Sequence, residues 1–231
     1  MAAWTKSEVR RAIVDAISPA VSDASFSYKK AAEAFVRKIE GGSQQLGLPL
    51  YDYNPVFEFS LTLCIRCDAV QEIVNRFSGA LSKYHASTLT SITQLEFLGV
   101  TPQPGRSVRF QAQSEAELAA IPPGVVELIA EHVLPFFDEY RDLAALNRGL
   151  NPAGAEVAAS VASGFDRRAF DATNQPYRAM TGVTVAYLAN DDRLADLIDA
   201  YRAQITPLPE AEQAKFEQLA SELNQRSNPK Q

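Results

Sequence analysis

The sequence predicts an α+β protein, in which an antiparallel β-sheet flanked by helices is followed by an all-α helical bundle. The prediction rests on a change in side-chain periodicity near residue 114. Before this point several segments alternate apolar and polar residues, which is typical of strands with one buried face. Beyond it apolar residues recur every three or four positions, as in helices. We therefore predict a sheet domain over residues 1–113 and a helical domain or extension over residues 114–231, which can pack as one unit.

The first helix is predicted over residues 7–17. Its apolar stripe repeats at four-residue spacing and consists of Val9, Ile13 and Ile17. Pro19 follows the last of these residues and is expected to end the helix, because proline has no amide hydrogen to donate.

Short alternating segments then predict an antiparallel meander. Residues 25–28 and 34–39 form its first strands, and Gly41-Gly42 supplies the positive φ that a hairpin turn needs. One face of the next strand carries Leu46, Leu48 and Leu50. Asn54-Pro55 should break that strand, because the residue before a proline is restricted and proline cannot join the ladder.

The clearest strand is predicted over residues 56–67. Its apolar face consists of Phe57, Phe59, Leu61, Leu63 and Ile65, and its polar face includes Glu58 and Arg66. Asp68 is expected to cap a helix over residues 69–81. Two further strands are predicted over residues 92–100 and 108–111.

Helices are predicted throughout the chain after Gln113. Ser114 opens a short helix to residue 121, as in a capping box with Glu117. Pro122-Pro123 then opens the longest amphipathic run, which reaches Leu143 and should kink at Pro135. The later predicted helices are one rich in small residues after Asn151-Pro152, and others over residues 175–189, 192–205 and 210–223.

Composition places the chain among ordinary globular proteins. Of its 231 residues, 46% are hydrophobic and 22% are charged, so the chain can bury a core without disulfides or metals. Two cysteines are too few for a disulfide framework. The first residues resemble no signal peptide, and no segment has the 18 or more apolar residues of a membrane span. A cytoplasmic location with no membrane association is expected.

The net charge of −6 is unevenly distributed along the chain. Residues 1–114 carry 12 Lys/Arg and 10 Asp/Glu, whereas residues 115–231 carry 10 Lys/Arg and 18 Asp/Glu. A nucleic-acid-binding module needs a basic surface, because neutralising phosphates supplies most of its affinity. No nucleic-acid partner is therefore expected.

The C-x-x-C motif Cys64-Ile65-Arg66-Cys67 is interpreted as structural. A closed zinc site needs four ligands, and the sequence contains no second cysteine pair. A redox C-x-x-C lies where a helix begins, whereas Cys64 lies in a predicted strand. Asp191-Asp192 is interpreted as a helix cap. The sequence contains no nucleotide fingerprint, and no metal or cofactor is expected.

Two sets of residues are candidates for a functional site. An enzyme of unrecognised class would use a polar pocket on the sheet face, in which Glu58, Arg66 and His85 converge. A protein-binding surface would use tyrosines, which are enriched in interfaces, and the acidic stretch from Glu115 to Asp142, which can attract a basic partner. The residues proposed for such a surface are Tyr51, Tyr53, Glu131, Asp138, Glu139 and Asp142.

Part of the first half resembles a known kind of domain. An opening helix is followed by Phe26-Ser27-Tyr28-Lys29, Phe35-Val36-Arg37-Lys38, Gln44-Gln45-Leu46 and Phe57-Glu58-Phe59-Ser60-Leu61, and then by a helix. This order resembles small uncharacterised bacterial α+β domains of unknown function, some of them encoded at polymorphic-toxin immunity loci. The resemblance covers residues 1–110, implies an antiparallel sheet flanked by helices, and is compatible with a non-catalytic binding role.

Two functional hypotheses follow. The first is a non-catalytic interaction protein, of the immunity or antitoxin type, that binds a basic protein partner. The second is an enzyme with a polar pocket on the sheet face. The small number of histidines and cysteines favours the first hypothesis, because a catalytic triad or a metal site is usually built from these residues. The oligomeric state is left open.

Overall fold

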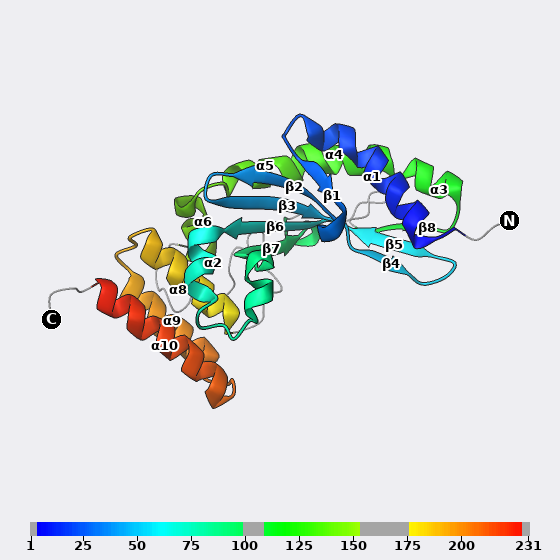
Figure 1. The fold of residues 1–231 in the computed structure, drawn as a ribbon. Helices are drawn as coiled ribbons and strands as arrows, with labels where there is room; N and C mark the ends of the chain where they lie inside the picture. Colours follow the sequence, from blue (N-terminus) through cyan, green and yellow to red (C-terminus); the bar gives the residue numbers. More distant parts are fainter. Residues whose placement is uncertain (1–3, 99–108, 153–175, 228–231) are drawn as a thin grey trace. The chain divides into compact units, whose positions relative to one another are not determined.

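The computed structural model describes residues 4–98, 109–152 and 176–227 and has the predicted α+β class (Figure 1). The described strands form two sheets and all precede residue 113, and the described elements that follow them are helices. The chain divides into two compact units. Unit 1 consists of Met1–Cys64 and Thr93–Glu139, and unit 2 of Ile65–Ile92 and Tyr140–Gln231. The units therefore interleave along the chain, whereas the sequence predicts one division near residue 114.

Unit 1 contains both helices and strands. Its helical elements are α1 (Lys6–Ser22), η1 (Lys30–Ala32), η3 (Leu95–Leu98), α3 (Glu115–Ala120), α4 (Pro122–Leu128), the π-helical turn η4 (Ile129–Val133) and α5 (Leu134–Glu139). The described strands are β1 (Ser27–Lys29), β2 (Ala34–Ile39), β3 (Gly42–Gly47), β4 (Leu50–Asp52), β5 (Phe57–Ser60), β6 (Thr62–Cys67), β7 (Ser91–Gln94) and β8 (Arg109–Ala112). The boundaries between the two units fall within β6 and β7.

One sheet has the strand order β1-β2-β3-β6-β7, and the other has the order β4-β5-β8. The pairs β1–β2, β2–β3, β4–β5 and β5–β8 are antiparallel, as predicted. Gly41 turns the β2–β3 hairpin at φ +67°, a conformation that suits glycine because it has no Cβ. In the second sheet Phe59 pairs with Phe110, and their rings stack at 4.8 Å.

Two predicted strands are each divided in the structure. The row from Phe57 to Ile65 is buried as expected, but the ladder is interrupted at Leu61, so that β5 and β6 join different sheets. Leu46, Leu48 and Leu50 are likewise buried, while β3 and β4 belong to different sheets. Buried and less buried residues continue to alternate across both breaks. The sequence pattern therefore does not show where one strand ends and the next begins.

The prediction that Pro19 ends the first helix is wrong. Helix α1 continues to Ser22, and Val21 extends the buried stripe of Val9, Ile13 and Ile17 by one turn. Pro19 leaves the carbonyl of Asp15 without its helical donor, but Asp15 lies on the exposed side. Burial of Val21 offsets the cost of the lost hydrogen bond.

Asp68 is not a cap, and its helix is shorter than predicted. Cys67 occupies the N-cap position of α2 (Asp68–Val74), and the Asp68 carboxylate instead accepts a hydrogen bond from Arg66 Nε at 2.6 Å. After Val74 the chain tightens into i→i+3 turns, with Arg76 N donating to Ile73 O. The described part of the predicted strand at residues 92–100 is only β7, followed by η3, and residues 99–108 lie outside the described residues.

Ser114 caps α3 as predicted, because its Oγ accepts a hydrogen bond from Glu117 N at 3.3 Å. The Glu117 carboxylate accepts from Gln113 N, one residue before the position of a capping box. The helical run Glu115–Glu139 satisfies a length and hydropathy criterion for a membrane span, although none is expected from the sequence. This is weak evidence, because a core helix of a water-soluble protein satisfies the same criterion.

The predicted amphipathic helix that reaches Leu143 is two helices in the structure. A π-helical turn, η4, directly precedes the part that contains Pro135, and α5 ends at Glu139. A new helix, α6 (Leu143–Leu150), begins after Asp142, whose Oδ1 accepts a hydrogen bond from Ala145 N at 2.8 Å. The buried stripe continues through the break as far as Tyr140.

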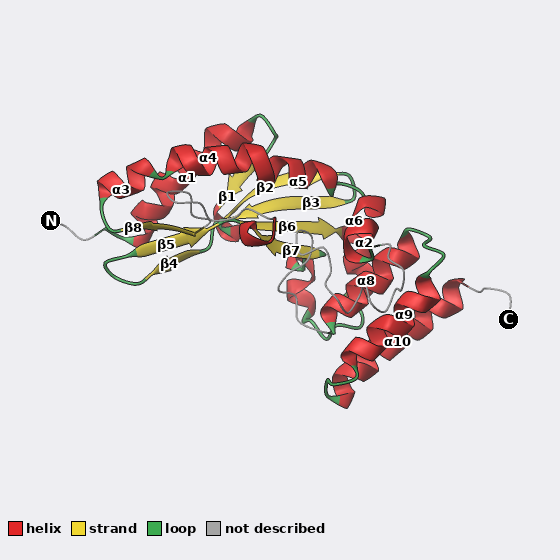
Figure 2. Ribbon diagram, turned by 180° about the vertical axis from the view of Figure 1, so that it is seen from behind, coloured by secondary structure: helices red, strands yellow, loops and turns green. Residues whose placement is uncertain are grey.

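Unit 2 is built mainly from helices. Besides α2 and α6 it contains η2 (Ser82–Ser87), α8 (Tyr177–Leu188), α9 (Leu194–Ile205) and α10 (Glu210–Ser227). The last three correspond to the predicted helices, and Figures 1 and 2 show α9 and α10 side by side. The predicted small-residue helix after Pro152 lies outside the described residues.

Gly182 allows helices α8 and α9 to approach closely. A Cβ at this position would lie 2.3 Å from the hydroxyl oxygen of Tyr201. That hydroxyl is buried and donates a hydrogen bond to Asn151 Oδ1 at 3.0 Å, so the ring cannot move without breaking the bond. Burial raises the pKa of Tyr201 far above its usual range, and the hydroxyl stays protonated.

Asp191 bends the chain into α9 without acting as its N-cap, which is Arg193. Its carboxylate accepts hydrogen bonds from the Arg193 guanidinium at 2.6 Å, from Asn147 Nδ2 and from Arg193 N. These bonds, led by that of the guanidinium, lower the pKa of Asp191 from 3.8 to about 2.

We predict that Gly182→Ala destabilises the protein by about 1–3 kcal/mol, because the new methyl group overlaps Tyr201. The measurement is the urea midpoint of unfolding, followed by circular dichroism. Gly124→Ala in α4 is the matched control, since a Cβ there meets no atom within 4 Å and should leave stability nearly unchanged. Equal midpoints for the two variants would contradict the prediction.

We predict that Asp191→Asn removes stability that depends on pH. Because the folded pKa is depressed, the carboxylate stabilises the fold above pH 4, and this contribution disappears as the pH falls from about 4 to about 2. The shift corresponds to about 2 kcal/mol, which solvent screening of the ion pair reduces to about 1 kcal/mol. The check is denaturant unfolding of both proteins at pH 7 and pH 3, with a smaller difference expected at pH 3.

Candidate functional site

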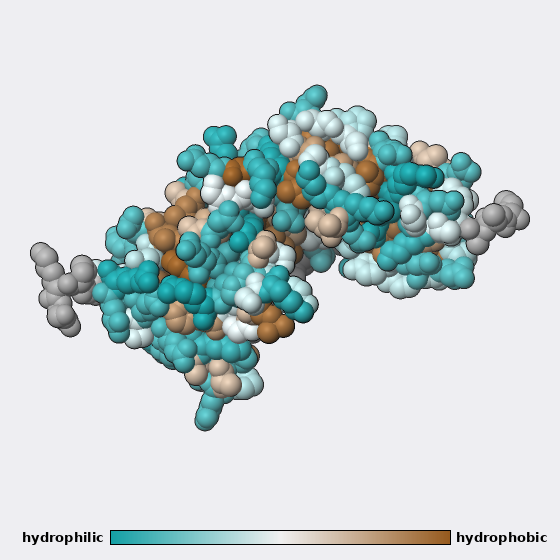
Figure 3. Space-filling model, in the orientation of Figure 1, coloured by the Kyte–Doolittle hydropathy of each residue, from teal (hydrophilic) through white to brown (hydrophobic). Residues whose placement is uncertain are grey.

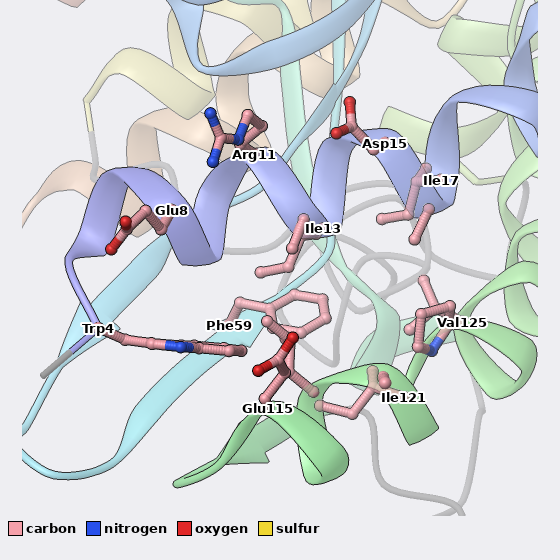
Figure 4. Close-up of a pocket in the computed structure, with 15 residues that line it drawn as sticks. Trp4, Glu8, Arg11, Ile13, Asp15, Ile17, Phe59, Glu115, Ile121 and Val125 are labelled. Carbon is pink, nitrogen blue, oxygen red and sulfur yellow. The ribbon is translucent and has the colours of Figure 1, made fainter. Parts of the chain in front are cut away.

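A cavity of about 460 Å³ lies in unit 1 between α1 and the helices α3 and α4 (Figure 4). Ligand-binding pockets have volumes of about 300–1,000 Å³. The apolar walls come from Ile13 and Ile17 of α1, Phe59 of β5, Leu118 of α3, Ile121, and Val125 of α4. These residues bring together three segments that are far apart in the sequence.

Local structure fixes each wall of the cavity. The four-residue stripe of α1 turns Ile13 and Ile17 toward the interior, where both are buried. Phe59 is held from behind by its stacked partner Phe110 on β8. On the third side Pro122 begins α4, which places Val125 on the first turn that faces α1.

Trp4 and Glu115 give the cavity its polar features. Trp4 directly precedes Thr5, whose hydroxyl and amide form a capping box with Glu8 at the start of α1. These hydrogen bonds lower the pKa of Glu8, so its carboxylate stays charged at the helix start. Figure 4 shows the Glu115 carboxylate directed from α3 toward the space beside the rings of Trp4 and Phe59.

The charges that line the cavity are mainly acidic. Its carboxylates are Glu8, Asp15 and Glu115, and its one basic residue is Arg11. Glu8 is bound to Thr5. In Figure 4 the charged groups of Arg11 and Asp15 project from α1 on the side away from Phe59 and Glu115. Glu115 makes no hydrogen bond or ion pair with the described part of the chain.

A second, polar depression of about 360 Å³ lies in unit 2, between α2 and η2. Arg66, Asn75 and His85 line it, together with Asp68, Glu72, Arg76 and Ala86. Arg66 Nη1 donates to the carbonyl oxygens of His85 and Thr88, at 2.9 and 2.6 Å. Its guanidinium thus holds η2 in place, and this role is structural.

The structure brings together two of the three residues of the enzyme hypothesis. Arg66 and His85 line the same depression, but Arg66 contacts the backbone of His85 and not its ring. His85 Nε2 lies 2.9 Å from the carbonyl oxygen of Ala80, so this nitrogen carries the proton and cannot accept one from a substrate. Glu58 belongs to unit 1, where it accepts a hydrogen bond from Gln111 at 2.7 Å.

Tyr51 and Tyr53 lie on the β4–β5 hairpin and are exposed, with 49% and 62% of their surface accessible. Their rings stack with a centroid separation of 6.1 Å and an interplanar angle of 14°. Asp52, between them, accepts a hydrogen bond from Asn54 N at 3.1 Å and so fixes the turn. The hairpin therefore presents two parallel aromatic faces to solvent.

The acidic residues of the predicted surface have different roles. Asp138 accepts a hydrogen bond from Arg37 Nη2 at 3.0 Å, and Asp142 caps α6 in unit 2. Glu131 lies beside His132, with 3.8 Å between Glu131 Oε2 and His132 Nε2. Glu139 is exposed at the end of α5. Asp138 and Asp142 thus stabilise the fold, although both are exposed.

Neither cysteine forms a disulfide. Cys64 is buried in β6, and its burial raises the pKa of the thiol to about 12, whereas Cys67 is half-buried at the N-cap of α2. Within the described residues no group of three or more His, Cys, Asp or Glu side chains is placed to hold a metal ion.

Sequence reasoning identified the walls of the cavity but not the cavity itself. The apolar stripe of α1 and the row that contains Phe59 are both predicted as core. Glu115 is predicted only as part of the acidic stretch up to Asp142, and no pattern places it or Trp4 at a cavity, because that placement depends on α1 lying against residues more than 100 positions away. A signal for Trp4 was available, because it is an aromatic residue directly before a capping box, where an apolar side chain packs on the start of the helix.

Comparison with known proteins adds no relative: no family model matches this chain, and neither a curated protein nor a solved structure is significantly similar to it.

We predict that only one of the two cysteines reacts with a thiol reagent in the folded protein. A pKa near 12 leaves about one thiol in ten thousand of Cys64 ionised at pH 8, and burial also blocks access to it. Ellman's reagent should therefore label one equivalent rapidly and the second only in denaturant. Cys67→Ser should abolish the rapid phase, and two equal rates would contradict the assignment.

Proposed function

We propose that this chain is a non-catalytic interaction protein of the immunity or antitoxin type, active in the cytoplasm, which binds a basic protein partner through unit 1. The observation that carries the proposal is the exposed, stacked pair Tyr51 and Tyr53 on a fixed hairpin of an acidic unit. The resemblance of residues 1–110 to domains encoded at immunity loci supports the choice of type.

The tyrosine pair has the features of an interface anchor. Tyrosine offers a large rigid surface at a low entropic cost, and it is enriched among the residues that dominate binding energy. The turn between β4 and β5 is held by the Asp52–Asn54 hydrogen bond and by that from Tyr53 N to Val56 O at 2.8 Å. The backbone that carries both rings is therefore held before a partner arrives, which reduces the cost of binding.

The charge of unit 1 favours a basic partner. It carries 9 Lys/Arg and 14 Asp/Glu, a net charge of −5, whereas unit 2 carries 13 and 14, a net charge of −1. The helical run Glu115–Glu139 contains six acidic residues and no Lys or Arg. Such a field increases the association rate with a basic protein at low salt.

The enzyme alternative has one observation in its favour, the joint presence of Arg66 and His85 in the unit 2 depression. Both side chains are already bound to backbone carbonyls there. Arg66 and His85 therefore have structural contacts, whereas the exposed Tyr51 and Tyr53 are available to a binding partner.

We predict that the double variant Tyr51→Ala, Tyr53→Ala binds the partner about 30-fold more weakly or worse, because two anchor side chains are lost. The partner is first isolated from host lysate on the immobilised full chain, identified, and then produced separately for titration calorimetry. Tyr84→Ala is the matched control, since Tyr84 is 53% exposed but lies on η2 in unit 2.

The same measurement, made by stopped flow, tests the electrostatic part of the proposal. Raising the salt from about 50 to about 500 mM should slow association by about tenfold or more, because screening removes the long-range attraction. An association rate that salt does not change, a partner that is not basic, or an unaffected double tyrosine variant would each refute the proposed function.

A further inference from the structure

We propose that the cavity beneath α1 receives a single arginine or lysine side chain of the basic partner. This inference rests on the proposed function and assigns its anchor site. The residues that would contact the side chain are Trp4, Phe59 and Glu115, together with the apolar walls Ile13, Ile121 and Val125 (Figure 4).

The cavity matches the two chemical parts of a long basic side chain. Arginine and lysine bury an apolar methylene stem and keep a charged group at its end. Ile13, Phe59 and Val125 provide apolar surface for the stem. The Glu115 carboxylate can accept hydrogen bonds from the charged end, and the indole of Trp4 can hold it by a cation–π contact.

Glu115 is available for this role. Its carboxylate makes no bond within the described part of the chain, so a cation from a partner does not have to displace an internal one. Other carboxylates of unit 1 are already occupied: Glu8 binds Thr5, Glu58 binds Gln111 and Asp138 binds Arg37. Glu115 thus differs from them in lying at an apolar cavity without a hydrogen-bond or ion-pair partner in the described part of the chain.

The lining excludes other kinds of occupant. The Glu115 carboxylate beside Trp4 and Phe59 repels an acidic side chain, and the charged groups of Arg11 and Asp15 project away from this part of the cavity in Figure 4. A purely apolar side chain would bury the Glu115 carboxylate without a partner, at a cost in desolvation. Figure 3 shows apolar patches among hydrophilic side chains over α1 and α4.

Trp4 provides a direct measurement, because it is the only tryptophan in the chain. The full-length protein is titrated with N-acetyl-arginine N-methylamide while the tryptophan fluorescence is recorded. N-acetyl-citrulline N-methylamide, which has nearly the same shape but no charge, is the matched probe. Saturable binding of the arginine compound, at least about tenfold tighter than that of the citrulline compound, is expected.

Two pairs of variants test the residues. Glu115→Gln should weaken the arginine compound by about tenfold or more, whereas Glu40→Gln, which removes the same charge from an exposed position of unit 1, should not. Ala119→Phe should fill the mouth of the cavity and abolish binding. Ala120→Phe is its control, because Ala120 is an exposed neighbour on α3 that does not line the cavity.

The outcomes separate this inference from the proposed function. Equal binding of the two compounds, no binding of either, or no effect of Glu115→Gln would overturn the assignment of the cavity. In the partner complex, a loss of affinity with Tyr51→Ala, Tyr53→Ala but none with Glu115→Gln or Ala119→Phe would refute the anchor site and leave the proposed function intact. Binding of the arginine compound without any basic protein partner would support the cavity and refute the proposed function.

Discussion

The burial of one row of apolar side chains, alternating from Phe57 to Ile65, constrains most of unit 1. Every second residue in this segment is buried, although the strand ladder is interrupted at Leu61. Because the row continues on one side of the chain, β5 and β6 can join different sheets and still contribute to the core. Phe59 in this row also forms a wall of the cavity beneath α1, so the same packing that stabilises the sheet shapes the candidate site.

A buried polar cluster complements this apolar row. Gln44 is fully buried on β3, accepts hydrogen bonds from Arg37 at 2.6 and 2.9 Å, and donates one to the carbonyl oxygen of Phe137 at 2.5 Å. Arg37 also lies over the ring of Phe26, which packs on Phe137 at 5.2 Å. Each polar group is satisfied, and the cluster holds α5 against strands β2 and β3 in a single arrangement. Asp138 accepts a hydrogen bond from Arg37 of this cluster, and its carboxylate is therefore less available to a partner.

The two candidate binding surfaces of unit 1 are the tyrosine hairpin and the cavity beneath α1, and the backbone of the fold positions both. The hairpin turn presents two parallel aromatic rings, and the meeting of α1 with α3 and α4 leaves a cavity with an acidic residue at its mouth. The hairpin turn is held by backbone hydrogen bonds, and the apolar walls of the cavity are held by packing in the free protein. Preorganisation of this kind lowers the entropic cost of association.

Local pattern determined the fold class, most helices and strands, and the buried faces, because periodicity reports which side chains turn inward. It failed where tertiary packing outweighs a local signal. Helix α1 continues past Pro19 because Val21 is buried, and the Asp68 carboxylate binds Arg66 and does not cap α2. The alternating pattern also continues through Leu61, where one strand ends and the next joins a different sheet. The exposed tyrosines and the acidic stretch that begins at Glu115 could be proposed from the sequence, whereas Trp4 and Glu115 come to line one cavity only when segments 100 residues apart meet. A cavity belongs to no single segment, and for that reason only the tertiary structure decided it.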